Sequence, residues 1–246
     1  MPKRGFKRLP DYISEVSEPL YDQIHSYVQI LDGVSRITNQ SISLIDFFKG
    51  EILYVSNNPL FLCGLTPKEV QELGPEFNRR YVPEKDIEYL SRVTQLWFEF
   101  IVEKPLEERK YYSLRLDYHL DHKPICVSMT PVFLSKDGKP WLLICNAIIS
   151  THSETGHATI FKYNSLTEWS FSETSQKWIE NERLLLRDIE EEVLRLAIQG
   201  KKENEICQLI YRSKDGLKSI KRKLFQKMEV SNITEAVSYA ISRGLI

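Results

Sequence analysis

The sequence predicts an α+β fold in two parts, an antiparallel sheet with helices followed by an all-α, four-helix domain at the C-terminal end. The stretch YYSLRLDYHL alternates apolar and polar residues, as a strand with one buried face does. Its apolar positions are Tyr112, Leu114, Leu116 and Tyr118, and its polar positions are Ser113, Arg115, Asp117 and His119. From Leu186 onward, apolar residues recur instead at the spacing of short amphipathic helices. A length of 246 residues suits two domains.

The composition narrows the class of protein. Apolar residues make up 42% of the chain and aromatic residues 11%, which is enough for well-packed cores. No apolar run approaches the ~18 residues that suggest a membrane span, and the N-terminal stretch lacks the apolar segment of a secretory signal. The four cysteines lie among apolar neighbours without metal-ligand spacing. We therefore expect a cytoplasmic protein with reduced thiols, no membrane contact, no metal and no cofactor.

Residues 1–40 are predicted to form a helical flank. Between Tyr12 and Thr38, apolar residues such as Leu20, Ile24 and Val28 recur at helical spacing. Such a helix either covers the sheet of its own chain or pairs with a second subunit. The sequence leaves both alternatives open.

Residues 41–150 carry the predicted sheet. SISLIDF and EILYVS indicate two short strands, and KPICVSMTPVFL and KPWLLICNAIIS indicate two long ones after YYSLRLDYHL. NNPLFLCGL and TPKEVQEL are expected to form two brief helical pieces between the short and the long strands. A longer helix is expected after VPEKD, because the apolar residues there keep a period of about 3.6. These residues are Ile87, Leu90, Val93, Trp97 and Phe100.

The order of these elements resembles that of a PAS domain. YVSNNPLFLCGLTPKEV is similar to the family's Y-V-N-x-A-x-x-x-x-x-G-Y-T-x-E-E-L, and the VPEKD segment at 82–86 is similar to its H-P-E-D. The resemblance implies a sensor that binds a small molecule between sheet and long helix, or that pairs with another domain through its sheet. The candidate cavity residues are Trp97, Tyr112, Tyr118 and Trp141. Aromatic residues at this spacing also suit an ordinary core.

The sequence gives little support for a bound cofactor or for an enzymatic function. Cys63 lies in FLCGL and not in the N-C-R-F-L-Q helix of flavin-binding relatives, and the long helix has no histidine for haem. His119 and His122 lack a third metal ligand. An enzyme could be built around His119, Asp117 and Cys126, but no nucleophile, base and acid occur at a recognisable spacing, and no glycine-rich phosphate loop is present. The chain is therefore not expected to be an enzyme.

Residues 151–180 are predicted to be a strand-rich extension and linker. HATIFKYN, LTEWSFS and QKWIE carry strand-like aromatic residues, and this composition is too apolar for a flexible tether. We expect a hairpin here, followed by a helix from about Glu180 that leads into the last domain.

Residues 181–246 show the start and stop signals of four helices. Gly200 suits the end of the first helix, because glycine tolerates positive φ, and Ser213 can cap the third helix. One stripe of the third helix is apolar: Leu217, Ile220, Leu224 and Met228. Between Lys201 and Met228 there are nine basic residues and three acidic ones, a local net charge of +6 within a chain of net charge −1.

This last segment resembles the LuxR/GerE-type helix-turn-helix. The motifs that carry the resemblance are EVLRLAIQG from Glu192, NEI from Asn204, GLKSIKRKLFQKM from Gly216 and SNITEAV from Ser231. Gly216 stands where the family usually has threonine, which removes a side chain from the start of the recognition helix. The resemblance implies that the third helix enters the major groove of DNA.

The predicted function is that of a transcription regulator that binds double-stranded DNA as a homodimer, with a small-molecule or protein effector at the first domain. The expected phosphate and base contacts are Lys214, Lys218, Ser219 and Arg222, and the further backbone contacts are Lys221 and Lys223. The alternative is an interaction module in which the first domain binds another protein and the C-terminal helices have little affinity for DNA.

Overall fold

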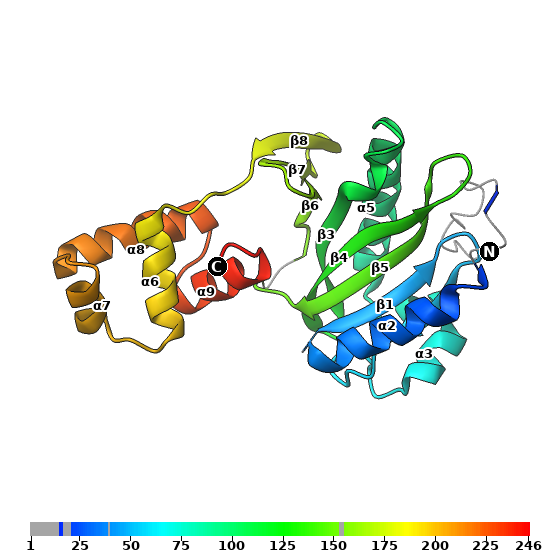
Figure 1. The fold of residues 1–246 in the computed structure, drawn as a ribbon, viewed down its shortest axis with the longest axis horizontal. Helices are drawn as coiled ribbons and strands as arrows, with labels where there is room; N and C mark the ends of the chain where they lie inside the picture. Colours follow the sequence, from blue (N-terminus) through cyan, green and yellow to red (C-terminus); the bar gives the residue numbers. More distant parts are fainter. Residues whose placement is uncertain (1–14, 17–20, 39, 153–154) are drawn as a thin grey trace. The chain divides into compact units, whose positions relative to one another are not determined.

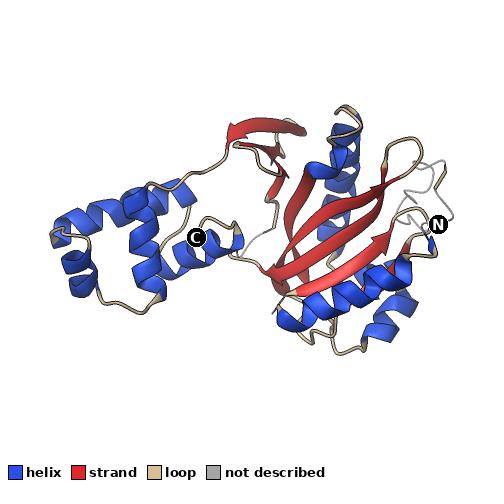
Figure 2. Ribbon diagram, in the orientation of Figure 1, coloured by secondary structure: helices blue, strands red, loops and turns tan. Residues whose placement is uncertain are grey.

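The computed structural model describes residues 15–16, 21–38, 40–152 and 155–246. It divides into two compact units, Met1–Asn181 and Glu182–Ile246. Figures 1 and 2 show a sheet with helices in the first unit and only helices in the second. The α+β class predicted from the sequence is therefore confirmed at this level.

The sheet of the first unit has eight strands among the described residues, in the order β2-β1-β5-β4-β3-β6-β7-β8. The strands are β1 Ser41–Asp46, β2 Glu51–Val55, β3 Tyr112–Leu120, β4 Lys123–Leu134, β5 Pro140–Ile149, β6 Ala158–Lys162, β7 Thr167–Ser172 and β8 Lys177–Glu182. The pairs β1–β2, β1–β5, β5–β4, β4–β3, β3–β6 and β6–β7 are antiparallel. The five strands expected in residues 41–150 are all present.

The polar face of β3 is less exposed than its alternation predicts. Ser113 and Asp117 are buried on the side opposite Leu114 and Leu116. The Ser113 hydroxyl lies 2.8 Å from that of Thr130, and the Ser150 hydroxyl donates to Asp117 Oδ1 at 2.6 Å. Both faces of this strand are therefore covered, because hydrogen-bond partners from neighbouring segments satisfy its polar groups.

Within the described residues of the first unit, the helices are α2 Ile24–Ile37, α3 Pro67–Leu73, α4 Pro75–Tyr81 and α5 Glu84–Val102, with a short 3-10 turn, η2, at Arg109–Tyr111. Thr66 and Glu69 cap α3 reciprocally, as TPKEVQEL leads one to expect. The helical piece predicted in NNPLFLCGL is wrong, since this segment is a series of turns with positive φ at Cys63 and Gly64. Helix α4, which begins at Pro75, was not predicted.

The two faces of the sheet carry separate cores (Figure 1). Helix α5 packs against one face, where Val93, Trp97 and Ile101 are fully buried. Helix α2 packs against the other face, where its inner residues join a cluster that contains Trp141 and Leu142. The described part of the N-terminal flank therefore covers its own sheet, although Ile30 and Ile37 remain exposed on the outer side of α2. The earlier part of the predicted helix, from Tyr12, lies mostly outside the described residues.

The extension does not end in a helix at Glu180. Strand β6 pairs with β3, so that residues 158–182 continue the sheet, and Glu180 lies in β8. Its carboxylate accepts a hydrogen bond from Trp169 Nε1 at 3.0 Å. The first helix of the second unit begins only at Asp188, where Glu190 accepts a hydrogen bond from the backbone N–H of Arg187.

Within residues 182–246, all of which the structure describes, the helices are α6 Asp188–Ile198, α7 Glu203–Leu209, α8 Lys214–Met228 and α9 Ile233–Ser242. Gly200 follows α6 with a φ of 74°, as predicted for its C-terminal cap. The stripe of α8 faces inward, since Leu217 and Met228 are each 2% exposed and Leu224 is fully buried. No helix within the described part of the chain is both long and apolar enough to cross a membrane.

Candidate nucleic-acid interface and ligand cavity

Three of the predicted DNA contacts form one exposed row on α8. Lys214, Lys218 and Arg222 are spaced four residues apart and are all exposed. Side chains at this spacing lie on the same face of a helix. Ser213 caps the helix, because its hydroxyl oxygen accepts a hydrogen bond from the Gly216 N–H at 3.1 Å. The sequence therefore places three cationic side chains on one face of α8, a helix whose N-terminus is capped by Ser213.

The other predicted DNA contacts lie outside this exposed row. Lys223 is exposed but lies outside this row, and Ser219 is half-buried. Lys221 is also half-buried, and its ammonium lies 2.5 Å from Glu203 Oε1 of α7. This hydrogen bond lowers the pKa of the Glu203 carboxyl. Lys221 thus ties α7 to α8, and part of its charge is already balanced.

A buried carboxylate fixes α8 against α6. Glu190 is 2% exposed, and its Oε1 lies 2.8 Å from an Arg187 guanidinium nitrogen. Its other oxygen lies 3.2 Å from Lys227 Nζ. Burial opposes ionisation of Glu190, but the hydrogen bonds from Arg187 and Lys227 outweigh it, so the pKa of this carboxyl is lowered. Lys227 therefore links α8 to α6 through Glu190 and serves the fold of the unit.

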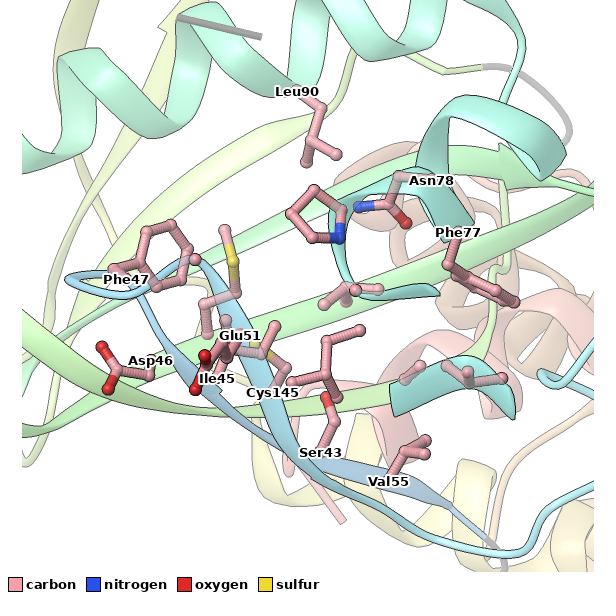
Figure 3. A pocket seen from close by; sticks show the side chains of 18 of the residues that line it. Ser43, Ile45, Asp46, Phe47, Glu51, Val55, Phe77, Asn78, Leu90 and Cys145 are labelled. Carbon is pink, nitrogen blue, oxygen red and sulfur yellow. The ribbon is translucent and has the colours of Figure 1, made fainter. Parts of the chain in front are cut away.

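The first unit contains a cavity of about 620 Å³ between the sheet and the helices α3, α4 and α5 (Figure 3). Figure 3 shows Leu90 directed from α5 toward the strands that carry Ser43 and Cys145. The walls are mainly apolar, but they also include uncharged polar residues such as Ser43, Asn78, Thr94, Tyr118 and Cys145 and the charged residues Asp46, Lys49, Glu51, Glu76 and Arg79. This size and lining are typical of small-molecule sites. Burial raises the pKa of the Tyr118 hydroxyl, and that of the Cys145 thiol to about 12, so both groups are neutral near pH 7.

Of the four aromatic residues predicted to line a cavity, Tyr118 lies in the wall of this one, and the other three are not among its lining residues. Trp97 is fully buried in the core between α5 and the sheet, and Tyr112 packs against Phe100 with ring centroids 5.7 Å apart. Trp141 lies on the opposite face of the sheet, where its Nε1 donates to Asp46 Oδ1 at 3.2 Å. Strand alternation fails for Trp141 because the register between β4 and β5 shifts at the start of β5.

The residues considered for an enzyme do not assemble as a catalytic group. His119 Nδ1 lies 2.9 Å from Asp86, not from Asp117, and Asp117 instead accepts a hydrogen bond from Ser150. Asp117 and Cys126 are paired across β3 and β4. Among the described residues, no group of three or more His, Cys, Asp or Glu side chains could hold a metal ion.

The second unit matches a known family of DNA-binding domains. Residues 186–240 match the GerE model of the bacterial regulatory proteins of the luxR family. The chain therefore carries a LuxR-type helix-turn-helix domain over these residues, as their motifs predict. No curated protein matches the chain.

Solved structures with similar features include three of VqmA. The phage VqmA–DPO complex is 14% identical, with a TM-score of 0.34 over 92% of this chain and 91% of that chain. The Vibrio cholera VqmA–ligand–DNA complex is 15% identical, with a TM-score of 0.25 over 92% and 88%. The Vibrio cholerae VqmA dimer in the absence of target DNA is 16% identical, with a TM-score of 0.25 over 91% and 88%. Likenesses at these TM-scores do not establish a shared fold.

Proposed function

We propose that this chain is a cytoplasmic transcription regulator that binds double-stranded DNA through the exposed row of α8 and senses a small molecule in the cavity of its first unit. The observation that carries the proposal is the row Lys214, Lys218 and Arg222 on the recognition helix of a LuxR-type domain. Phosphate contacts supply affinity, and contacts to base edges supply sequence preference. The two lysines are suited to phosphates, and the planar guanidinium of Arg222 is suited to a guanine edge.

We expect Lys218→Ala to weaken binding of the full chain to all duplexes. The loss of one phosphate contact should lower the slope of log affinity against log salt by about one unit. Fluorescence anisotropy with labelled duplexes at several salt concentrations measures both quantities. Lys68→Ala on α3 is the matched control, because Lys68 is also a helical lysine, its side chain is 85% exposed, and it lies in the other unit.

Lys221→Ala gives a second comparison within α8. Glu203 already balances part of the Lys221 charge. Lys221→Ala should therefore change the slope of log affinity against log salt less than Lys218→Ala does. If Lys218→Ala leaves both affinity and slope unchanged, the exposed row is not the DNA contact. If the wild-type chain itself binds no duplex, the alternative of a protein-interaction module with little DNA affinity is favoured.

The cavity supports a sensor of the PAS type. Its ligand should be small, with a mainly apolar body and a few polar groups, because the mainly apolar wall also offers side chains such as Asn78 and the neutral Tyr118 hydroxyl and Cys145 thiol. Asp46, also at the cavity wall, already accepts hydrogen bonds from the Phe48 and Lys49 N–H groups and from Trp141. Its charge is therefore engaged within the fold. Native mass spectrometry of the protein purified from its own host should find a small molecule bound to the first unit.

Helix α5 supplies a route from this cavity to the DNA-binding domain. On one side, its residues Leu90 and Thr94 line the cavity. On the other side, Arg92 binds both carboxylate oxygens of Glu173 at 2.9 Å, and Trp178 Nε1 donates to the Leu96 carbonyl at 3.3 Å. Trp178 lies in β8, which ends at Glu182, where the second unit begins. A ligand that shifts α5 would therefore move the strand that leads directly into the DNA-binding unit.

A homodimer fits the exposed apolar residues of both units. Ile241 of α9 is 57% exposed, and Ile30 and Ile37 of α2 are 63% and 85% exposed. One small helical domain offers a limited footprint on DNA, so paired domains on successive half-sites would give tighter and more selective binding. Sedimentation of the full chain as a monomer at micromolar concentration would contradict this part of the proposal.

A further inference from the structure

Tyr211 occupies an unusual position in the turn between α7 and α8. Its side chain is 91% exposed, and its φ of 53° lies in the left-handed region. Among the described residues, it has no hydrogen-bond partner for its hydroxyl and no ring contact. A large side chain in this conformation is unfavourable, because its Cβ crowds the backbone, whereas glycine or asparagine adopts it readily.

The geometry of the turn accounts for the left-handed backbone at residue 211, but it does not account for a tyrosine side chain there. Backbone hydrogen bonds close the end of α7, from the Tyr211 N–H to the Gln208 carbonyl at 3.3 Å and from the Arg212 N–H to the Cys207 carbonyl at 2.9 Å. These bonds require a left-handed residue at position 211 and make no use of an aromatic ring or a hydroxyl. The fold therefore accounts for the backbone conformation at position 211, while the exposed ring and hydroxyl remain available to a binding partner.

The place of Tyr211 in the chain indicates what it binds. It precedes the cap residue Ser213 by two positions, at most about 7 Å of chain. Lys214 and Lys218 follow, both exposed, so the surroundings are strongly cationic. In a helix-turn-helix the N-terminal end of the recognition helix reaches the bases, and the phosphates border the groove on both sides. A residue in the turn just before this end therefore lies at the level of a phosphate.

We propose that the Tyr211 hydroxyl donates a hydrogen bond to a backbone phosphate of the bound DNA, beside the groove that α8 enters. Tyrosine is among the neutral side chains that make such contacts, and the bond fixes position without reading sequence. This contact rests on the proposed function of α8 and adds a neutral donor to its cationic row.

The test compares four variants of the full chain with the wild type by fluorescence anisotropy across salt concentrations. Tyr211→Phe removes only the hydroxyl and should weaken binding about tenfold. Its salt slope should equal that of the wild type, because a neutral donor displaces no counterion. Lys218→Ala, in contrast, should lower the slope. The unfolding midpoint of Tyr211→Phe should not change, since the hydroxyl has no partner in the fold.

Tyr211→Gly and Glu229→Gly form a matched pair. Glu229 has a φ of 57° at the opposite end of α8 and is also exposed. Both changes relieve the same backbone strain, so neither should lower the unfolding midpoint of the second unit. Only Tyr211→Gly should weaken DNA binding. This result would separate a binding role of Tyr211 from a role in folding.

Two outcomes overturn the contact, and they can be told apart. If the wild type binds DNA and Tyr211→Phe binds within twofold of it, the contact is absent while the proposed function stands. If the wild type binds no DNA, the proposed function fails, and the contact fails with it.

Discussion

Leu224→Ala is expected to unfold the DNA-binding unit and to abolish its DNA binding. Leu224 is fully buried in the core that joins α6, α8 and α9, beside Leu194, Met228, Ala236 and Ala240. Truncating a buried leucine costs about 2–5 kcal/mol. A small domain has only about 5–15 kcal/mol of stability in total, so this loss removes a large share of it.

Thermal unfolding of the full chain, followed by circular dichroism and tryptophan fluorescence, measures this effect. The tryptophan residues all lie before residue 182, so fluorescence reports on the first unit alone. The helical signal of the second unit should be lost at lower temperature, while the fluorescence transition should not move. Ile198→Ala at the end of α6 is the control and should have little effect, because Ile198 is 50% exposed. A shift of both transitions by Leu224→Ala would show that the two units share one core.

Trp97→Ala should destabilise the first unit and leave the second unit intact. Its cost in unfolding free energy should equal or exceed that of Leu224→Ala. The Trp97 indole is fully buried between α5 and the sheet, where it packs against Phe98 with ring centroids 5.2 Å apart. Replacing a buried tryptophan by alanine costs about 3–5 kcal/mol. The first unit should therefore melt at lower temperature, and the second unit should keep its own transition.

Leu106→Ala provides the control for this substitution, since Leu106 is 57% exposed in the same unit. DNA affinity measured below both transitions should also be retained in Trp97→Ala, because the LuxR-type domain folds around its own core. Loss of the second transition together with the first would contradict this independence.

The elements with a regular hydrophobic pattern were predictable, and those that depend on distant partners were not. Helix α8 follows from its buried stripe and its serine cap, and α5 follows from its period. NNPLFLCGL was mistaken for a helix because its apolar residues allow one, whereas Cys63 and Gly64 adopt left-handed turns. The segment at Glu180 also carries helix-forming residues, but sheet pairing and the contact with Trp169 make it a strand.

The residues of the candidate sites were likewise predictable where they depend on local sequence pattern, and not where they depend on distant partners. The exposure of Lys214, Lys218 and Arg222 follows from their position opposite the apolar stripe. The pairing of Lys221 with Glu203 does not, because Glu203 lies on a different helix. Tyr118 faces the cavity as strand alternation indicates, whereas the shift in register at the start of β5 removes Trp141 from it. Polar cavity residues such as Asn78 come from a helix that the sequence did not reveal.

The central claim is that the exposed face of α8 lies in the major groove of DNA. Methylation of guanine N7, which is accessible only from the major groove, tests it most directly. Duplexes enriched from a random pool by the full chain should show protected guanine N7 positions in each half-site. Arg222→Ala should lose protection at specific guanines, and Lys218→Ala should need more protein for the same pattern. If no sequence is enriched, or if bound duplexes show protection only of adenine N3 in the minor groove, α8 does not act in this way.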